Sequence, residues 1–199
     1  MRVSDSYLDT YQNGGIYDNS TYGNPYASKG VKFARFLKPL LKKNSKVLCI
    51  GCGNGFEVME YLQQGHDAYG TELHDVDVGV LNGRIIKAVV PDLPFKDNEF
   101  DLLHCTEVME HIPTENTDIF LKECKRVSKS QLFSVATDMD IYKTHINIQT
   151  PSWWYETFVR NDFQIKNFQY KPITNLDLGI MQCQVYYPNG VIVYADGNN

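Results

Sequence analysis

A glycine-rich turn between an apolar run and a helical pattern constrains this sequence more than any other feature. The apolar run, Val47 to Ile50, predicts a buried strand. Three glycines alternate with other residues directly after it: Gly51, Gly53 and Gly55. A helical pattern of apolar residues then runs to about Gln64. Strand, glycine turn and helix predict the first half of a nucleotide-binding βαβ unit, in which a ligand lies against the backbone.

The glycine spacing excludes two common nucleotide-binding motifs. A dinucleotide fingerprint, Gly-x-Gly-x-x-Gly, would need its third glycine at position 56 or 58, where the chain has Phe56 and Val58. A P-loop would need Gly-Lys-Ser/Thr, which the sequence lacks. A dehydrogenase is therefore a distant alternative. On this motif alone, a glycine turn that binds no ligand also stays open.

Two segments resemble the class I S-adenosylmethionine (SAM)-dependent methyltransferases. Gly51-x-Gly53-x-Gly55 resembles motif I of that family. Residues 91–113 resemble the second signature of its small-molecule members, with an acid before Leu93-Pro94-Phe95, Phe100-Asp101 at the start of a strand, and Glu-Val-x-Glu-His at 107–111. The resemblance covers residues 46–135 well and the last third only by general pattern.

Strands that alternate with helices and end in antiparallel strands predict an α/β sandwich. With the resemblance, we expect a Rossmann-like three-layer sandwich with a mostly parallel seven-stranded sheet and an antiparallel C-terminal hairpin. Helices are expected from residue 27 with a kink at Pro39, over 56–64, after Pro113-Thr114, and from Thr150-Pro151 to about 161. The predicted strands span 47–50, 67–72, 84–89, 100–104, 131–135, 163–170, 182–187 and 191–194. Pro188-Asn189-Gly190 predicts a hairpin turn between the last two.

We expect a single domain in three parts. Residues 1–26 would form an N-terminal arm, 27–137 the SAM-binding core and 138–199 the substrate-side half. The arm is rich in tyrosine among turn-forming residues. It is either loosely packed or a flap over the cofactor, and Tyr22 is its candidate substrate contact.

Glu72 is the first candidate cofactor residue outside the glycine loop. It ends a predicted strand about 20 residues after Gly51, where an acid accepts hydrogen bonds from ribose hydroxyls. By resemblance, the loop lies along the methionine and ribose parts of SAM, and the other contacts follow the strand ends. The full predicted cofactor set is Gly51, Cys52, Gly53, Gly55, Glu72, Leu73, Asp92, Leu93, Cys105 and Thr106.

Candidate catalytic residues are Glu107 and His111, which by resemblance face the reaction chamber, and His145 after the fifth predicted strand. Each histidine has a plainer interpretation, as a helix cap or as ordinary surface. Trp153 and Trp154 are neighbours and cannot share one helix face. We expect one in the core and the other, taken as Trp153, beside the substrate.

Two positions depart from the family pattern. Cys49 stands where the family usually has Asp or Glu, and Val89 stands where it usually has the adenine-binding Asp. Asp92 is the candidate substitute for the second. These departures motivate an alternative function, a SAM-fold binding or regulatory protein without catalysis.

Composition limits the partners. The 199 residues carry a net charge of −5, which disfavours duplex nucleic acid as a partner. Five cysteines, an odd number, suggest a reducing compartment, and we expect a cytoplasmic protein. We see no signal peptide and no apolar run long enough to span a membrane.

No metal ligands are expected from the sequence. Cys49-x-x-Cys52 lacks the second ligand pair of a zinc site, and Asp75 and Asp77 lack the other ligands of a calcium loop.

Methyl transfer from a sulfonium needs alignment more than acid–base chemistry, because the leaving group is a neutral thioether. The leading hypothesis is a SAM-dependent methyltransferase that methylates a small-molecule or modest polar acceptor by in-line displacement, with S-adenosylhomocysteine as product.

Besides the binding protein, a protein or nucleic-acid methyltransferase is the further alternative. The residues after the fourth strand, Cys105-Thr106-Glu107-Val108, lack the Asn/Asp-Pro-Pro-Tyr/Phe motif of base amino-group methylation. The sequence leaves the oligomeric state open.

Overall fold

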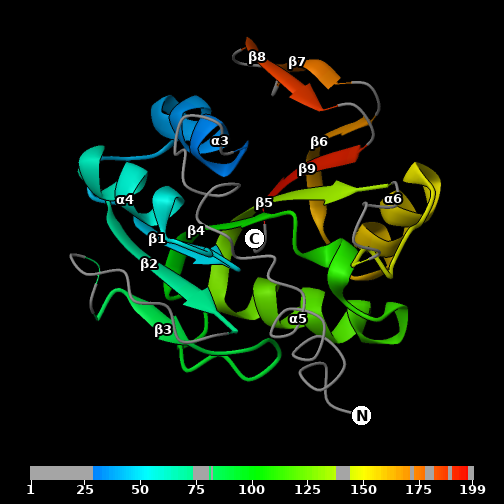
Figure 1. Ribbon diagram of the computed structural model, residues 1–199, viewed down its shortest axis with the longest axis horizontal. Helices are drawn as coiled ribbons and strands as arrows, with labels where there is room; N and C mark the ends of the chain where they lie inside the picture. Colours follow the sequence, from blue (N-terminus) through cyan, green and yellow to red (C-terminus); the bar gives the residue numbers. More distant parts are fainter. Residues whose placement is uncertain are drawn as a thin grey trace.

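The computed structural model has a seven-stranded sheet with helices on both faces (Figure 1). The structure describes residues 29–73, 81, 83–137, 144–170, 173–177, 182–187 and 190–196. The predictions for the N-terminal arm, including Tyr22, and for Asp75 and Asp77 lie outside these residues. None of the described helices is long and apolar enough to cross a membrane.

The described elements follow the predicted alternation closely. The strands are β1 Lys46–Ile50, β2 Asp67–Glu72, β3 Ile85–Lys87, β4 Phe100–Thr106, β5 Ser128–Ala136, β6 Gln164–Tyr170, β7 Ile173–Asp177, β8 Gln182–Tyr187 and β9 Gly190–Asp196. The α-helices are α3 Lys29–Leu37, α4 Phe56–Gln63, α5 Thr117–Val127 and α6 Pro151–Arg160. Short 3₁₀ helices are η1 Lys38–Leu40, η3 Met109–His111 and η4 Thr114–Asn116.

Local sequence signals set several of these boundaries. Helix α3 ends at Leu37, and η1, which contains Pro39, follows it directly. Gly65 follows α4 with φ 86°, a left-handed conformation that ends the helix. Thr150 caps α6, because its side chain accepts a hydrogen bond from the Trp153 N–H at 3.2 Å.

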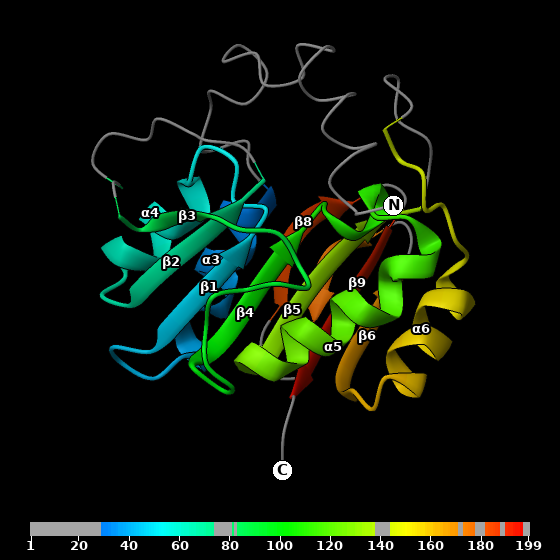
Figure 2. The same cartoon turned by 90° about the horizontal axis from the view of Figure 1, so that it is seen from below.

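The main sheet has the order β3-β2-β1-β4-β5-β9-β6. Strands β1 to β5 pair in parallel, and β9 runs antiparallel to both of its neighbours, β5 and β6. The predicted Rossmann-like, mostly parallel sheet with an antiparallel ending is confirmed. Figure 2 shows the strands fanned in this order with α5 and α6 in front of them.

The pairing predicted across Pro188-Asn189-Gly190 is wrong. β8 pairs with β7 in a separate two-stranded sheet, whereas β9 enters the main sheet. Both edges of β9 are occupied by β5 and β6, so no edge remains for β8. The C-terminal antiparallel hairpin is therefore made by β7 and β8, and the sequence did not indicate β7.

Alternating side chains of the parallel strands fill two cores. On one face, Leu48 of β1 and Leu103 of β4 pack with residues of α5 and α6. On the other face, Val47 and Leu102 pack with residues of α3 and α4. Strands buried on both faces explain the continuous apolar runs of the sequence.

The strand order creates a switch point between β1 and β4. From β1 the chain proceeds to β2 on one side, and from β4 it proceeds to β5 on the other. In open α/β sheets, ligands bind at the carboxyl ends of the strands beside such a point. The glycine turn follows β1 and Glu107 follows β4, so both lie at this point.

Candidate active site

The glycine turn adopts the backbone that its sequence predicts. Gly51, Gly53 and Gly55 have φ values of 63°, 51° and 75°, all in the left-handed region. Gly51 is also constrained by packing, since a Cβ there would lie 2.5 Å from a Val108 methyl group. Gly55 directly precedes α4, so the N-terminal end of that helix adjoins the loop. The turn is thus preformed, with the N–H groups of Cys52, Gly53 and Gly55 bonded within the protein.

Glu72 lies against this loop, as the spacing predicted. Its side chain is buried, with 5% exposure, at the end of β2. One carboxylate oxygen accepts the Gly53 N–H at 2.8 Å, and the other accepts the Leu73 N–H at 2.7 Å. The loop is tied to the same strand a second time, because the Cys52 N–H donates to the Thr71 carbonyl at 3.1 Å.

These features fit the cofactor that the sequence suggests. A carboxylate oxygen has lone pairs beyond the one used by a single N–H, so Glu72 keeps capacity to accept ribose hydroxyls. Left-handed glycines and a helix N-terminus suit the carboxylate end of an amino-acid moiety.

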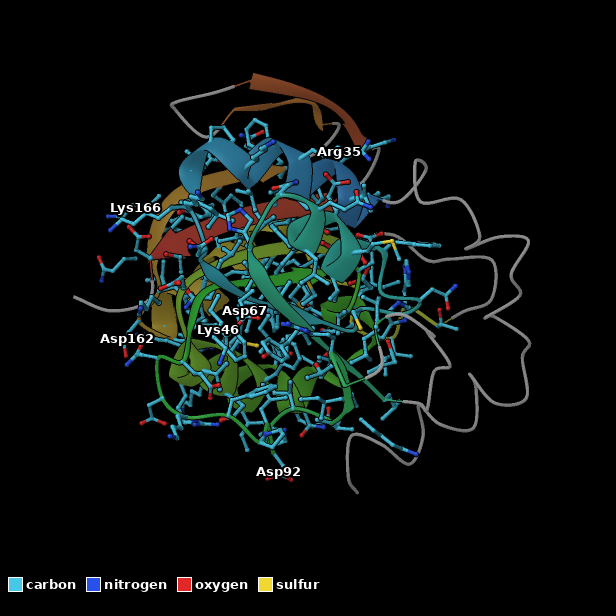
Figure 3. The ribbon with its side chains drawn as sticks, turned by 90° about the vertical axis from the view of Figure 1, so that its left-hand side faces the viewer. Arg35, Lys46, Asp67, Asp92, Asp162 and Lys166 are labelled. Carbon is cyan, nitrogen blue, oxygen red and sulfur yellow. The ribbon has the colours of Figure 1, made fainter. Side chains whose placement is uncertain are left out.

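The two residues expected at the adenine edge have different environments. Leu93 is buried, and its N–H donates to a Glu123 carboxylate oxygen at 3.1 Å. Asp92 is exposed, and its side chain points away from the body of the molecule (Figure 3). Asp92 is therefore brought to neither the glycine loop nor Glu72 by any described contact.

Cys105 and Thr106 belong to β4 itself, which is two residues longer than predicted. Cys105 is fully buried in the core beneath α5, and burial raises the pKa of its thiol. Thr106 is half-buried, with its hydroxyl 2.6 Å from Nε2 of His104. Only Thr106 of this pair keeps access to the carboxyl edge.

Cys49, the first departure from the family pattern, lies in an apolar environment. Cys49 is 2% exposed and belongs to the core under α3 and α4. Burial, with the nearby charge of Glu57, raises the pKa of its thiol. The position usually held by an acid is thus occupied here by a neutral, apolar group.

Glu107 directly follows β4 with φ 58°, an unusual backbone for a non-glycine residue. Its carboxylate forms an ion pair with the Lys29 ammonium of α3 at 2.6 Å. The Ser134 hydroxyl of β5 donates to the same carboxylate at 3.3 Å. Glu107 therefore joins the carboxyl ends of β4 and β5 to α3.

His111 and His145 are brought together, although they are distant in the sequence. Their ring centroids lie 4.9 Å apart with an edge-to-face angle of 77°. Nδ1 of His111 lies 3.0 Å from the Thr144 carbonyl oxygen. The segment of His145 is held against η3, because the Ile146 and Asn147 N–H groups both donate to the Glu110 carbonyl at 2.9 Å.

Glu110 was missed by the sequence prediction. It is fully buried beside His111, and burial, reinforced by the charge of Glu107, raises the pKa of its carboxyl group. The available signal was its place in Glu-Val-x-Glu-His, where it precedes a histidine already chosen. A glutamate in an apolar stretch gives no other indication that it will be buried.

The two tryptophans separate as predicted from their helix positions. Trp154 is fully buried, whereas Trp153 is partly buried and lies under the Arg160 guanidinium at 5.2 Å. A contact of Trp153 with a substrate stays a prediction.

Comparisons with known proteins agree with this fold. Residues 48–132 match a family model described as a methyltransferase domain. An uncharacterized protein of Methanocaldococcus jannaschii is 32% identical over 163 residues, which are 76% of this chain and 63% of that protein. The chain therefore spans less than two thirds of that relative's length.

Solved structures share the fold at low sequence identity. A 1,6-didemethyltoxoflavin-N1-methyltransferase of Burkholderia thailandensis, with bound 1,6-didemethyltoxoflavin and S-adenosylhomocysteine, has a TM-score of 0.69 at 13% identity and covers 98% of this chain and 87% of its own. A SAM-dependent methyltransferase of Archaeoglobus fulgidus also has a TM-score of 0.69, at 14% identity, covering 92% of this chain and 99% of its own.

The solved structures of this fold include SAM-dependent methyltransferases, one of them with bound S-adenosylhomocysteine. Residues 48–132 thus match a methyltransferase domain, and the chain has the fold of solved SAM-dependent methyltransferases.

Proposed function

We propose that this protein methylates a small-molecule or modest polar acceptor, with SAM as the methyl donor. One observation carries the proposal: a left-handed glycine loop tied to a buried carboxylate, Glu72, at the switch point of the sheet. Polar side chains that follow β4 and β5 lie together at the same edge and would line the side from which an acceptor approaches.

The roles of the chain's residues follow from this arrangement. The loop from Gly51 to Gly55 would hold the amino-acid end of the cofactor, and Glu72 would hold its ribose. SAM supplies a methyl group on a sulfonium, which leaves as a neutral thioether. The residues therefore have to align the acceptor and exclude water more than to donate a proton. Glu107, His111 and His145 are our candidates for orienting the acceptor, and Trp153 for contacting it.

The test is calorimetric titration of the protein with SAM and with S-adenosylhomocysteine. Glu72→Gln keeps one acceptor for the loop N–H groups but removes the charge. Because hydrogen bonds to charged groups are worth roughly 1.5–3 kcal/mol, we expect affinity for both ligands to fall by about tenfold or more.

Glu99→Gln is the matched control. Glu99 pairs with Lys46 at 2.5 Å, immediately before β4 and therefore at the opposite edge of the sheet, so its loss should leave binding unchanged. Absence of saturable binding at millimolar ligand would refute the proposal. Equal affinity of Glu72→Gln and the unaltered protein would show that the cofactor binds at a site that does not include Glu72.

A non-catalytic SAM-binding or regulatory role is the second candidate. It is favoured by Cys49, a buried thiol where the family usually has an acid. SAM binding without formation of S-adenosylhomocysteine, across a panel of hydroxyl, amine and thiol acceptors, would support it. The division into arm, core and substrate-side half, and the cytoplasmic location, remain proposals from the sequence.

A further inference from the structure

Three side chains of metal-ligand type converge at the carboxyl ends of β4 and β5. Glu110 and His111 come from η3, and His145 comes from the segment after β5. One ligand atom from each lies within 4.8 Å of the other two. Tetrahedral bonds of about 2.1 Å would place ligand atoms about 3.4 Å apart, so modest side-chain rotation would close the set.

Glu110 supplies an independent indication of a ligand. The residue is 0% exposed. Its Oε1 accepts the Ala136 N–H at 3.2 Å. Within the described part of the chain, Oε2 has no hydrogen-bond partner. A buried carboxylate oxygen without a donor is costly, and a bound cation would satisfy it.

The His111 ring is oriented in the way that metal-binding histidines are. A carbonyl oxygen can only accept, so Nδ1, 3.0 Å from the Thr144 oxygen, carries the hydrogen. The ring's lone pair then lies on Nε2. Histidine ligands usually donate their second nitrogen to a carbonyl or carboxylate in this manner, which fixes the tautomer needed for coordination.

The ligand types indicate which ions fit. Two imidazoles with one carboxylate suit Zn²⁺, Mn²⁺ or Fe²⁺, whereas Mg²⁺ and Ca²⁺ prefer sets made of oxygen. Three protein ligands also leave a coordination position open.

We propose that Glu110, His111 and His145 bind a divalent transition-metal ion such as Zn²⁺, and that its open position takes a hydroxyl oxygen of the methyl acceptor. The proposed metal binding does not depend on the proposed methyltransferase function, and it departs from the sequence prediction of no metal ligands. The proposed coordination of the acceptor's hydroxyl oxygen rests on the proposed methyltransferase function. The cluster adjoins the cofactor loop, because Val108, directly before η3, packs over Gly51.

Such an ion would explain how a weak nucleophile is activated without a dedicated base. A divalent cation lowers the pKa of a coordinated hydroxyl, and the proton passes to water. An oxygen electron pair then forms the bond to the methyl carbon. The sulfur–carbon bond breaks, and its electron pair stays on sulfur. The acceptor class is therefore an alcohol or phenol.

The experiment is calorimetric titration of the untagged, chelator-treated full chain with Zn²⁺, and with Co²⁺ followed by its visible spectrum. We expect one ion per chain. His145→Gln, at a half-buried position, should weaken binding by at least about 100-fold, and Glu110→Gln similarly. His66→Gln removes a histidine that directly precedes β2 and should bind Zn²⁺ as the unaltered protein does.

Absence of Zn²⁺ binding at micromolar protein, or equal binding by His145→Gln and His66→Gln, would overturn the metal site. His145→Gln keeps the test decisive if Glu110→Gln fails to fold. Acetohydroxamate, a small oxygen ligand, should change the Co²⁺ spectrum. An unchanged spectrum would overturn the open position and hence the acceptor class. SAM binding is measured separately, so failure of this site leaves the proposed function standing.

Discussion

Gly51 has two reasons to be glycine. Its φ of 63° is costly for any residue with a Cβ, and the space where that Cβ would lie is filled by Val108. Gly65 has only the first reason: its φ is 86°, but a Cβ there would meet nothing within 4 Å. Comparing Gly51 with Gly65 therefore separates the free-energy cost of backbone strain from that of side-chain packing.

We predict that Gly51→Ala destabilises the protein more than Gly65→Ala. Both changes incur roughly 1–2 kcal/mol of left-handed strain, and only Gly51→Ala adds the contact with Val108. Adding Val108→Ala to Gly51→Ala should recover the part of the stability loss that comes from the contact with Val108. Urea unfolding of the single and double variants measures the coupling. Equal costs at the two glycines, or additive effects of Gly51→Ala and Val108→Ala, would contradict this account.

Among the elements, α6 depends on its first residues. Thr150 accepts the Trp153 N–H, and Pro151 occupies the first helical position, where no N–H is needed. The helix then buries Trp154 and Phe158 in the core beside the sheet. A capping signal and an apolar stripe together placed this helix correctly from the sequence.

Thr150→Ala should lower the free energy of unfolding by about 1 kcal/mol, because one N–H of the first turn loses its acceptor. Thr150→Ser keeps the hydroxyl and should be close to neutral. Denaturant unfolding compares the two. If serine were as destabilising as alanine, the threonine methyl group rather than the cap would be the stabilising feature.

Across the whole molecule, burial between layers decides the ionisation of His104. This residue of β4 lies under α3 and α4, with its Nδ1 3.1 Å from the Tyr61 hydroxyl and its ring 6.3 Å from that of Phe33. Burial lowers its pKa from 6.5 to about 3. Between those pH values the unfolded chain binds a proton that the native protein does not, so stability falls as pH falls below 6.5.

We predict a loss of about 1.4 kcal/mol per pH unit from His104 below pH 6.5. His104→Gln retains a donor and an acceptor but cannot titrate. The unaltered protein should therefore lose about 2 kcal/mol more than this variant between pH 7 and pH 5. Urea unfolding at both pH values tests the difference, since the carboxylates titrate alike in both proteins. Parallel pH profiles would show that His104 takes up its proton equally in the folded and unfolded states.

The sequence by itself determined the local elements and the conformation of the glycine loop. Helix caps, glycines and apolar periodicity act over a few residues, so the boundaries of β2 and β8 and the interruption at Pro39 were predicted correctly. The position of Glu72 against the glycine loop was predicted for a similar reason. The carboxyl ends of adjacent parallel strands meet at one edge of the sheet. An acid about 20 residues after the glycine loop, at the end of the next strand, is therefore expected to lie beside that loop.

Only the tertiary structure decided how distant segments meet. It inserted β9 between β5 and β6, which left β8 to pair with β7. It also enclosed Cys105 in the core and brought His145 to Glu110 and His111. These outcomes depend on which strand edges remain available and on what covers each side chain. Both are set by contacts between residues far apart in the sequence, which no local pattern encodes.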